Sequence, residues 1–380
     1  MYLKEVNMAN YKTILNKYLH NYFLNRKRNF TTKYELPDFR KNAGTIIPLT
    51  KSEKKEIDNK RKVLNTSATY DYWLMYKNFV GFNSDYIADD DFMPQILRVL
   101  NPNPYYKALQ YKGFYPLYFN ELKKPNTIIN CINGVFYDSN NKIINCNDEN
   151  IKNIFQSNDS FIIKSTKGTC GGGGVRIINY NNLKQIIDTF KQYGNDFICQ
   201  EIVKQSPKTK CFNPSSLNTF RVSTLNINGK CSLATLLFRH GKDGNIVDNG
   251  GAGGIMVGIN PKNGRSIKSF DMSLMEYKQS PSGINYDTIC FDFIDKMIQI
   301  AINAHKYYLP NMGFAGWDFC LDENNDPVFI EVNLGYPGIL YEQLCSATPI
   351  FGERTLEIYE YVGRNLHKLY WKDDFIGSAL

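Results

Sequence analysis

Hydrophobic and polar positions divide the chain into two parts with different periodicity. Before about residue 100, apolar and aromatic residues recur at helical spacing, first in the stretch 11–23, which predicts a mostly helical N-terminal region. The basic cluster 26–28 ends that first helix, which either lies on an anionic membrane surface or packs on its own domain. The polar stretch 52–64 predicts a solvent-facing helix with Ser52 as its N-cap.

From about residue 105 the pattern changes to short apolar runs that alternate with amphipathic stretches. This alternation predicts sheets covered by helices, in the α+β or α/β class. Strands are predicted at 127–135, 161–164, 175–178, 197–203, 219–227, 231–239, 314–322 and 327–333, and helices at 148–157, 182–193, 288–308 and 353–369.

Composition excludes several classes of protein. The 380 residues are 43% hydrophobic and 22% charged, which is ordinary globular usage and enough for two or three domains. No run of 18 apolar residues occurs, so no transmembrane segment is expected. The first residues lack the apolar core of a signal peptide.

Charge and cysteine usage limit the cellular compartment and the kinds of ligand that we expect. Nine cysteines without a CxxC pair and four scattered histidines give little support to a zinc site or disulfides, and a cytoplasmic location is expected. The net charge of +8 favours anionic ligands, but it is weak evidence for nucleic acid, which is not expected as a partner.

A glycine-rich loop follows the strand that ends at Lys164. Its glycines are Gly168, Gly171, Gly172, Gly173 and Gly174. The loop lacks the Gly-Lys-Ser/Thr ending of a P-loop and leads into a strand rather than a helix, which excludes Walker A and Rossmann interpretations. Bare backbone N–H groups can fold over phosphate oxygens, with Lys164 supplying a cation. The alternative is a mobile hairpin without a ligand.

Acidic and amide side chains occupy the two C-terminal strands. The turn 322–326 joins them into a predicted hairpin. Glu331 and Asn333 are two residues apart and therefore share one face, which Asp318 can also share across the hairpin. Two carboxylates and an amide oxygen suit Mg²⁺. An acidic hairpin that faces solvent is the alternative.

Together these motifs resemble the ATP-grasp superfamily of carboxylate–amine ligases, over about residues 105–350. The resemblance implies two α+β subdomains that grip ATP, after a mostly helical region. Asp318, Glu331 and Asn333 match the family's magnesium triad, and Lys164 with its glycine loop matches the phosphate-covering hairpin. The implied cofactors are ATP and Mg²⁺.

The resemblance also implies nucleotide contacts and a domain division. The segment 197–203 is similar to the interdomain hinge, where Gln200, Glu201 and Val203 would contact adenine. Lys112 is similar to the family's first nucleotide lysine. The expected division is a helical region (1–104), a pre-grasp segment (105–150), an N-terminal grasp subdomain (151–203) and a C-terminal grasp subdomain (204–380).

The middle segment resembles the sugar-transfer-associated branch of the superfamily. The matching stretches are 213–222, 238–241 and 247–254. Arg221 and Arg239 are planar cations suited to a transferring phosphoryl group, unless either is a structural ion-pair partner. The expected substrate contacts are Asn218, Asn249, Gly250 and Gly251, since glycine amides can approach a carboxylate or acyl phosphate closely.

Three further features remain open. Asp248 belongs either to the site or only to a turn. The turn 335–338 either binds the acceptor or is a tight turn without a ligand. His240 is either a base for the amine or a histidine of a surface loop.

The implied activity is an ATP-dependent ligase that activates a carboxylate as an acyl phosphate and couples it to an amine. Its expected setting is bacterial surface-polysaccharide modification, with a sugar-linked carboxylate and an amino acid as substrates and possible peripheral association with glycan-assembly enzymes. The alternatives are an ATP-grasp kinase for a small molecule or sugar, and a non-catalytic nucleotide- or glycan-binding protein.

Overall fold

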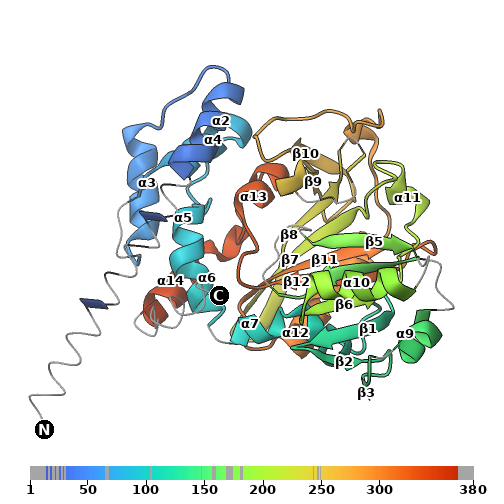
Figure 1. Ribbon diagram of the computed structural model, residues 1–380. Helices are drawn as coiled ribbons and strands as arrows, with labels where there is room; N and C mark the ends of the chain where they lie inside the picture. The colour runs from blue at the N-terminus through green and yellow to red at the C-terminus, as the bar shows by residue number, and fades with distance from the viewer. Residues whose placement is uncertain are drawn as a thin grey trace, which may run out of the picture.

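The structure is a computed structural model of the chain (Figure 1). It describes residues 31–366 except 65–67, 103–104, 147, 156–159, 168–173, 180–182, 243, 246–247 and 249, together with isolated positions before residue 31. Most of the predicted helix at 11–23 and its basic end therefore lie outside the described residues.

The N-terminal region is helical, which confirms the prediction. Its elements are η1 (Thr31–Glu35), α2 (Leu36–Asn42), α3 (Lys51–Arg61), α4 (Asp71–Val80), α5 (Asp89–Asp91), η2 (Phe92–Ile96) and α6 (Leu97–Leu100), followed by α7 (Tyr105–Leu109), η3 (Lys112–Phe114) and α8 (Tyr115–Tyr118). The prediction of Ser52 as a cap is wrong, because Thr50 caps α3 in a reciprocal capping box with Glu53. Among the described helices, none is long and apolar enough to cross a bilayer.

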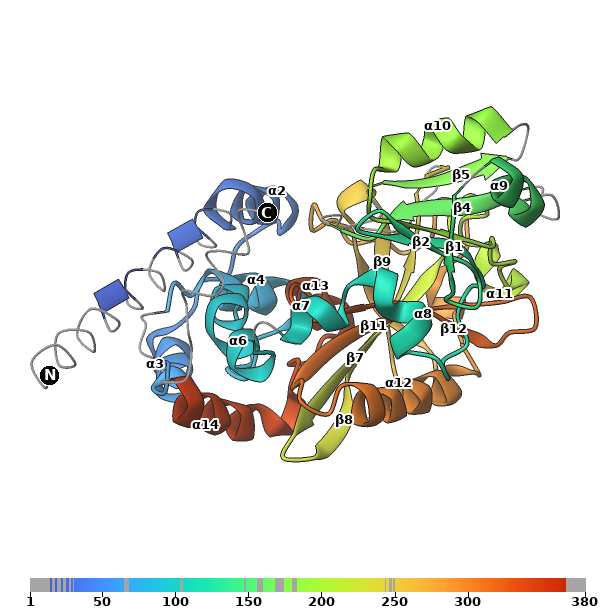
Figure 2. The same cartoon turned by 60° about the horizontal axis from the view of Figure 1, so that its bottom comes forward.

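The first sheet has the order β3-β2-β1-β6-β4-β5. Its elements are β1 (Thr127–Ile132), β2 (Val135–Tyr137), β3 (Ile143–Ile144), β4 (Ser160–Ser165), β5 (Val175–Asn179) and β6 (Phe197–Gln200), with α9 (Asp148–Phe155) and α10 (Leu183–Tyr193). Both helices pack on one face of the sheet through Phe155 and Phe190 (Figure 2). The opposite face is therefore left for polar side chains of the strands.

The second sheet has the order β10-β9-β8-β7-β11-β12. Its elements are α11 (Pro207–Lys210), β7 (Thr219–Ile227), β8 (Lys230–His240), η4 (Gly250–Ala252), β9 (Ile255–Ile259), β10 (Ser266–Phe270), η5 (Tyr286–Thr288), α12 (Ile294–Tyr308), β11 (Phe314–Leu321), β12 (Pro327–Asn333), α13 (Leu340–Ser346), η6 (Gly352–Arg354) and α14 (Thr355–Asn365). The sequence predicted β7, β8, β11 and β12 to within a residue but missed β9 and β10. The helices begin later than predicted at 288–308 and 353–369.

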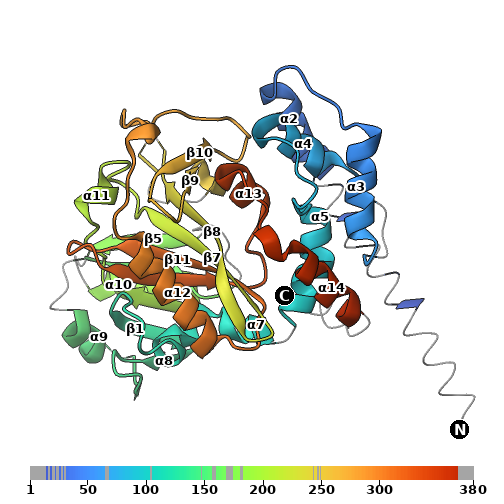
Figure 3. The same ribbon diagram turned by 180° about the vertical axis from the view of Figure 1, so that it is seen from behind.

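Helices cover the two faces of the second sheet unequally. α12 lies across β7, β8 and β11 (Figure 3), and its apolar side chains join Phe220, Val222 and Trp317 in the main core. The short helix α13 lies on the other face, over β8, β9 and β10, together with α4. The strands near β12 keep a polar strip on that second face.

Two buried amides fasten the helical region to the second sheet. Asn101 donates to the carbonyls of Phe314 and Leu334 at 2.7 and 2.8 Å, and its oxygen accepts from two backbone N–H groups at the start of β11. Gln343 of α13 donates to the Tyr76 hydroxyl at 2.6 Å and to a carbonyl beside α5. Because buried polar groups are costly when unpaired, these bonds fix the placement of both elements.

Gly258 on β9 lets α13 lie directly on the sheet. A Cβ at this position would lie 2.0 Å from the carbonyl oxygen of Cys345. We expect Gly258→Ala to lower the free energy of unfolding by about 3 kcal/mol, because the backbone of α13 would have to move. Urea unfolding is the measurement.

Gly229→Ala is the matched control, since Gly229 has a φ of +74° but open space around it. Its cost is the backbone strain alone, about 1–2 kcal/mol. Equal losses in the two variants would contradict the close packing of α13 on β9.

Candidate active site

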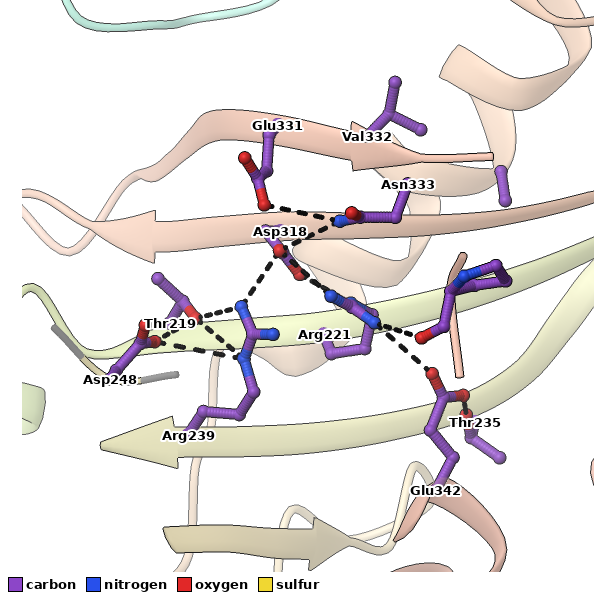
Figure 4. A network of polar contacts seen from close by, with 12 residues as sticks. Thr219, Arg221, Thr235, Arg239, Asp248, Asp318, Glu331, Val332, Asn333 and Glu342 are labelled. Carbon is purple, nitrogen blue, oxygen red and sulfur yellow. Dashed lines mark hydrogen bonds and ion pairs between the residues drawn. The ribbon is translucent and has the colours of Figure 1, made fainter. Parts of the chain in front are cut away.

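Strand alternation and register gather the predicted site residues on one face of the second sheet. Asp318 pairs with Glu331 on one side and with Arg221 on the other. Because side chains alternate between faces, Asn333 shares this face, whereas Val332 points to the opposite side (Figure 4). The predicted common face of the triad is thus what the register produces.

Asp318 is buried between two guanidinium groups (Figure 4). Its Oδ1 accepts from Nε of Arg221 at 2.6 Å, and its Oδ2 accepts from Nη2 of Arg221 at 3.1 Å. Nη2 of Arg239 lies 2.9 Å from the same Oδ2. Opposite charges with good hydrogen-bond geometry compensate the loss of water around this carboxylate.

Arg221 has a second acidic partner on α13. Its Nη1 donates to the carbonyl of Pro337 at 2.8 Å and lies 3.6 Å from Oε1 of Glu342. Burial disfavours the charged guanidinium, but Asp318 and Glu342 outweigh that cost and raise the pKa of Arg221 above its usual range. Gly316 makes room for this side chain, since a Cβ there would lie 3.2 Å from Cδ of Arg221.

Arg239 is held by Thr219, whose hydroxyl accepts from Nε at 3.1 Å and from Nη2 at 2.8 Å. The same hydroxyl donates to the carboxylate of Asp248. Burial raises the pKa of Asp248, although Arg239 opposes this effect. Asp248 therefore belongs to the polar cluster and is more than a turn residue.

Glu331 carries the charge of the outer strand. Its Oε2 lies 2.7 Å from Nζ of Lys112. Burial raises the pKa of this carboxyl, but the ammonium groups of Lys112 and Lys164 outweigh it and hold the pKa at about 2. The amide of Asn333 connects the two carboxylates, with Nδ2 at 3.2 Å from Asp318 and 3.5 Å from Glu331.

Lys164 reaches the cluster from the first sheet. It follows the core residue Ile163 on β4, so it faces away from α9 and α10. Removal from water and the nearby charge of Lys112 lower the pKa of Lys164 to about 8, against the attraction of Glu331. The first sheet thus contributes Lys164, whereas the second sheet carries the carboxylates Asp318 and Glu331 together with Arg221 and Arg239.

Hydrogen bonds from the first sheet position the turn that carries Lys112. Tyr111 donates to Asp196 at 2.6 Å and accepts from Thr166 at 3.2 Å, at the end of β4. Asn130 of β1 donates to the carbonyl of Gly113 at 2.7 Å. The residue beside Lys112 therefore links it to the base of the glycine loop.

The expected adenine contacts lie at the end of β6. Gln200 is buried on the face shared with Lys164 and donates to the carbonyl of Pro125 at 3.3 Å. Glu201 is exposed and accepts from Asn126 at 2.8 Å, and Val203 is half-buried. In the loop, Gly174 has a φ of +76° and is exposed, whereas Gly171, Gly172 and Gly173 lie outside the described residues.

The expected substrate contacts are not all supported. Asn218 is fully buried, and its amide donates to the carbonyls of Thr209 and Asn213 while accepting from Ser216. Asn218 therefore holds its own loop together, and its contact with substrate stays a prediction. Gly250 and Gly251 lie in η4, with Gly251 exposed, and Asn249 lies outside the described residues.

The prediction that His240 lies in a surface loop is wrong. It lies at the buried end of β8, where Nδ1 is 2.8 Å from the carbonyl of Gly241 and Nε2 is 2.8 Å from the hydroxyl of Tyr286. Burial lowers its pKa to about 4. The ring is therefore buried and neutral, and both of its nitrogens have polar partners.

Sequence reasoning missed Glu342 and Thr219. Each of these two residues acts through a partner that is distant in the sequence or on a neighbouring strand, so no local sequence motif predicts its role. The alternation of polar residues along β7 and β8 is the one signal that groups Thr219 with Arg221 and Arg239.

The donor set fits a hard divalent cation. Within the described part of the chain, no cluster of three His, Cys, Asp or Glu residues suits a metal, so the set depends on the amide of Asn333. Two carboxylates and this amide converge from neighbouring strands, as Mg²⁺ ligands do. Coordination requires the amide to present its oxygen instead of the nitrogen that now faces Asp318.

Two antiparallel sheets whose polar faces meet at cations and carboxylates define the class to which the chain belongs, the ATP-grasp fold. The model of one family, described as sugar-transfer associated ATP-grasp, matches residues 98–357. The chain belongs to this family, which confirms the resemblance seen in its motifs. No curated protein matches the sequence.

Several solved structures are similar at low identity. D-alanyl-alanine synthetase A from Vibrio cholerae is 13% identical, with a TM-score of 0.40 over 69% of this chain and 66% of that one. A biotin carboxylase from Campylobacter jejuni is 12% identical, with a TM-score of 0.42 over 68% and 46%. An L-amino acid ligase from Bacillus licheniformis is 11% identical, with a TM-score of 0.35 over 64% and 42%. The chain thus spans less than two thirds of each of these structures.

The pair Lys112–Glu331 predicts a pH-dependent contribution to stability. The pKa of Glu331 is depressed to about 2 in the folded chain, so its contribution is present above its ordinary pKa of about 4.5 and is lost as the pH falls toward 2. We expect Lys112→Met to lower the free energy of unfolding by about 1–3 kcal/mol at pH 7, and by progressively less below pH 4.5. Urea unfolding at several pH values measures this difference.

Lys123→Met is the matched control, because Lys123 pairs with Asp322 and Asp326 but is 49% exposed. Exposed pairs contribute about 0–1 kcal/mol. A Lys112→Met loss that does not change with pH would contradict the coupling to Glu331.

Proposed function

We propose that this protein is an ATP-dependent ligase that phosphorylates a carboxylate and couples it to an amine. The observation that carries the proposal is the ion pair of Lys112 with Glu331 beside Asp318 and Asn333, with Lys164 of the first sheet near enough to lower the pKa of Glu331. This arrangement offers cations for a polyphosphate and oxygen donors for Mg²⁺. Membership in an ATP-grasp family supports the same reading.

In this proposal each subdomain has one task. The N-terminal grasp subdomain (151–203) binds ATP through Lys164, the loop containing Gly171, Gly172, Gly173 and Gly174, and the hinge residues Gln200, Glu201 and Val203. The C-terminal subdomain (204–380) holds Mg²⁺ on Asp318, Glu331 and Asn333. The bound Mg²⁺ would supply charge neutralisation for the β- and γ-phosphates. The segment 105–150 contributes Lys112.

The chemistry needs charge neutralisation and positioning rather than a protein nucleophile. An oxygen of the substrate carboxylate attacks the γ-phosphorus of ATP, and ADP leaves. The amine then attacks the acyl carbon, the C–N bond forms and the C–O bond to the phosphate breaks. Inorganic phosphate leaves and takes up the proton that the amine loses. Arg239 is the guanidinium placed to face the transferred group, because its Nη1 makes no hydrogen bond within the described part of the chain, whereas Arg221 is engaged on both sides.

The substrates we propose are a sugar-linked carboxylate and a small amine such as an amino acid. The turn 335–338 lies beside Arg221, through the carbonyl of Pro337, and its Tyr336 is exposed. We assign the acceptor to this turn and to the glycines of η4. A cytoplasmic role in surface-polysaccharide modification, near glycan-assembly enzymes, fits the branch of the family.

The test incubates the purified protein with ATP, Mg²⁺, a panel of uronic acids and a panel of amino acids. A ligase releases inorganic phosphate only when both a carboxylate and an amine are present. ADP formation without free phosphate indicates a kinase instead. Nucleotide binding without turnover on any pair indicates a non-catalytic binding protein.

We expect Glu331→Gln to lower the rate of phosphate release by at least about a thousandfold, because it removes one anionic donor of the proposed Mg²⁺ site. Circular dichroism and urea unfolding should show a folded chain. Glu357→Gln is the matched control, since Glu357 pairs with Arg354 on the surface. Full activity of Glu331→Gln would remove the metal assignment.

Nucleotide affinity should depend on pH through Lys164. Its ammonium has a pKa of about 8 in the free protein, and a bound phosphate raises that pKa, so binding takes up a proton above pH 8. Affinity for ATP should therefore fall by up to about tenfold per pH unit between pH 8 and 9, measured by calorimetry. Lys164→Arg keeps its charge at these values and should show a flat profile. Equal slopes for both proteins would contradict this role.

A further inference from the structure

Glu342 is a buried carboxylate whose bonds are incomplete. It is 3% exposed, and its Oε2 accepts from the hydroxyl of Thr235. Within the described part of the chain, its Oε1 has no hydrogen bond of normal geometry, although the hydroxyl of Ser223 lies near enough to this carboxylate to lower its pKa. The same oxygen lies 3.6 Å from Nη1 of Arg221. Burial raises the pKa of this carboxyl although Arg221 opposes the effect. A buried charge that is only partly compensated is costly, so an arrangement that completes the hydrogen bonds of Glu342 would be more stable.

Asp318, in contrast to Glu342, has hydrogen bonds to both of its carboxylate oxygens. Both oxygens of Asp318 are already occupied by Arg221, and its Oδ2 also faces Arg239 and Asn333. A divalent cation on Asp318 would have to compete with two guanidinium groups. It would also repel Arg221, which is buried and cannot retreat to solvent.

We propose that Glu342 is the positioning residue that holds Arg221 when Asp318 turns to a divalent cation. In the present arrangement Arg221 bonds to Asp318, and its Nη1 lies 3.6 Å from Oε1 of Glu342. When the cation takes the charge of Asp318, Arg221 moves its hydrogen bonds to Oε1 of Glu342. This inference rests on the proposed Mg²⁺-dependent function.

The position of Glu342 is fixed well enough for this role. Thr235 holds its second oxygen, and the next residue of α13, Gln343, is clamped by Tyr76 and by backbone groups of the helical region. Arg221 also remains tied to the carbonyl of Pro337 at 2.8 Å. The guanidinium can therefore exchange carboxylates while it stays in place beside the turn 335–338.

The experiment measures binding of the non-hydrolysable ATP analogue adenylyl-imidodiphosphate by calorimetry, with and without Mg²⁺, to wild type and Glu342→Gln. We expect Glu342→Gln to weaken binding in Mg²⁺ by about tenfold or more, the effect of one charged hydrogen bond. Binding without Mg²⁺ should stay within about twofold, because Arg221 then keeps Asp318. A merely structural role would lower thermal stability without selecting the Mg²⁺ condition.

Controls separate the possible results. Glu357→Gln, a carboxylate-to-amide change at a surface pair, should behave as wild type. Should Glu342→Gln not fold, Glu342→Asp takes its place, because its shorter carboxylate keeps the charge but retreats from Arg221. For Glu342→Asp, an intermediate loss of affinity for the analogue that occurs only in the presence of Mg²⁺ supports the inference. Equal losses with and without Mg²⁺, or no loss, overturn it and leave the proposed function standing, whereas a wild type that binds the analogue no better with Mg²⁺ overturns both.

Discussion

The burial of one carboxylate between two guanidinium groups governs the arrangement of the site. Asp318 is 2% exposed, and Arg221 and Arg239 lie against it and compensate the loss of water around its carboxylate. The three side chains come from β11, β7 and β8, and their adjacency follows from the antiparallel register of these strands. A slip of one residue in any strand would turn its charged side chain into the apolar core around Trp317.

The charges around Asp318 nearly balance before any ligand enters. Among the described residues of the cluster, four cations (Lys112, Lys164, Arg221 and Arg239) face four carboxylates (Asp248, Asp318, Glu331 and Glu342). A free polyphosphate would add uncompensated negative charge to this half-buried space, and a free divalent cation would add positive charge. A cation and a polyphosphate that enter together disturb the balance least, which physically favours a metal-bound nucleotide.

The parts of the site that the sequence predicted are those that one strand or one hairpin encodes. The triad of Asp318, Glu331 and Asn333 follows from period-two spacing across a turn, and Lys164 follows from its place at the end of a strand. The residues that support them come from elsewhere. Glu342 lies on a short helix far along the chain from Arg221, and only the folded sheet brings them together.

The fold shows the same division. The lengths of β7 and β12 were predictable because their apolar runs are bounded by turn residues, Asn228 and Gly229 after β7 and the segment 322–326 before β12. β9 and β10 escaped because glycines and small polar residues surround them, and their pairing depends on β8. His240 was mistaken for a surface residue because a charged arginine precedes it and a glycine follows, although the strand turns its ring inward toward Tyr286. Burial of this kind is a tertiary property that local composition does not encode.

The helical region is part of the site's support and not an appendage. Asn101 bonds to the first residue of β11 and to Leu334 after β12. It thereby fixes the position of Asp318 on β11 relative to Asn333 on β12. Gln343 ties α13 to α4 and to the backbone before α5, and it thereby sets the position of Glu342. The carboxylates that lie nearest to Arg221 are therefore fixed through two amides, one that reaches from the helical region to the second sheet and one that reaches from α13 to the helical region. Since neither amide can leave its partners without burying unpaired polar groups, a shift of the helical region would displace Asp318 and Glu342 together.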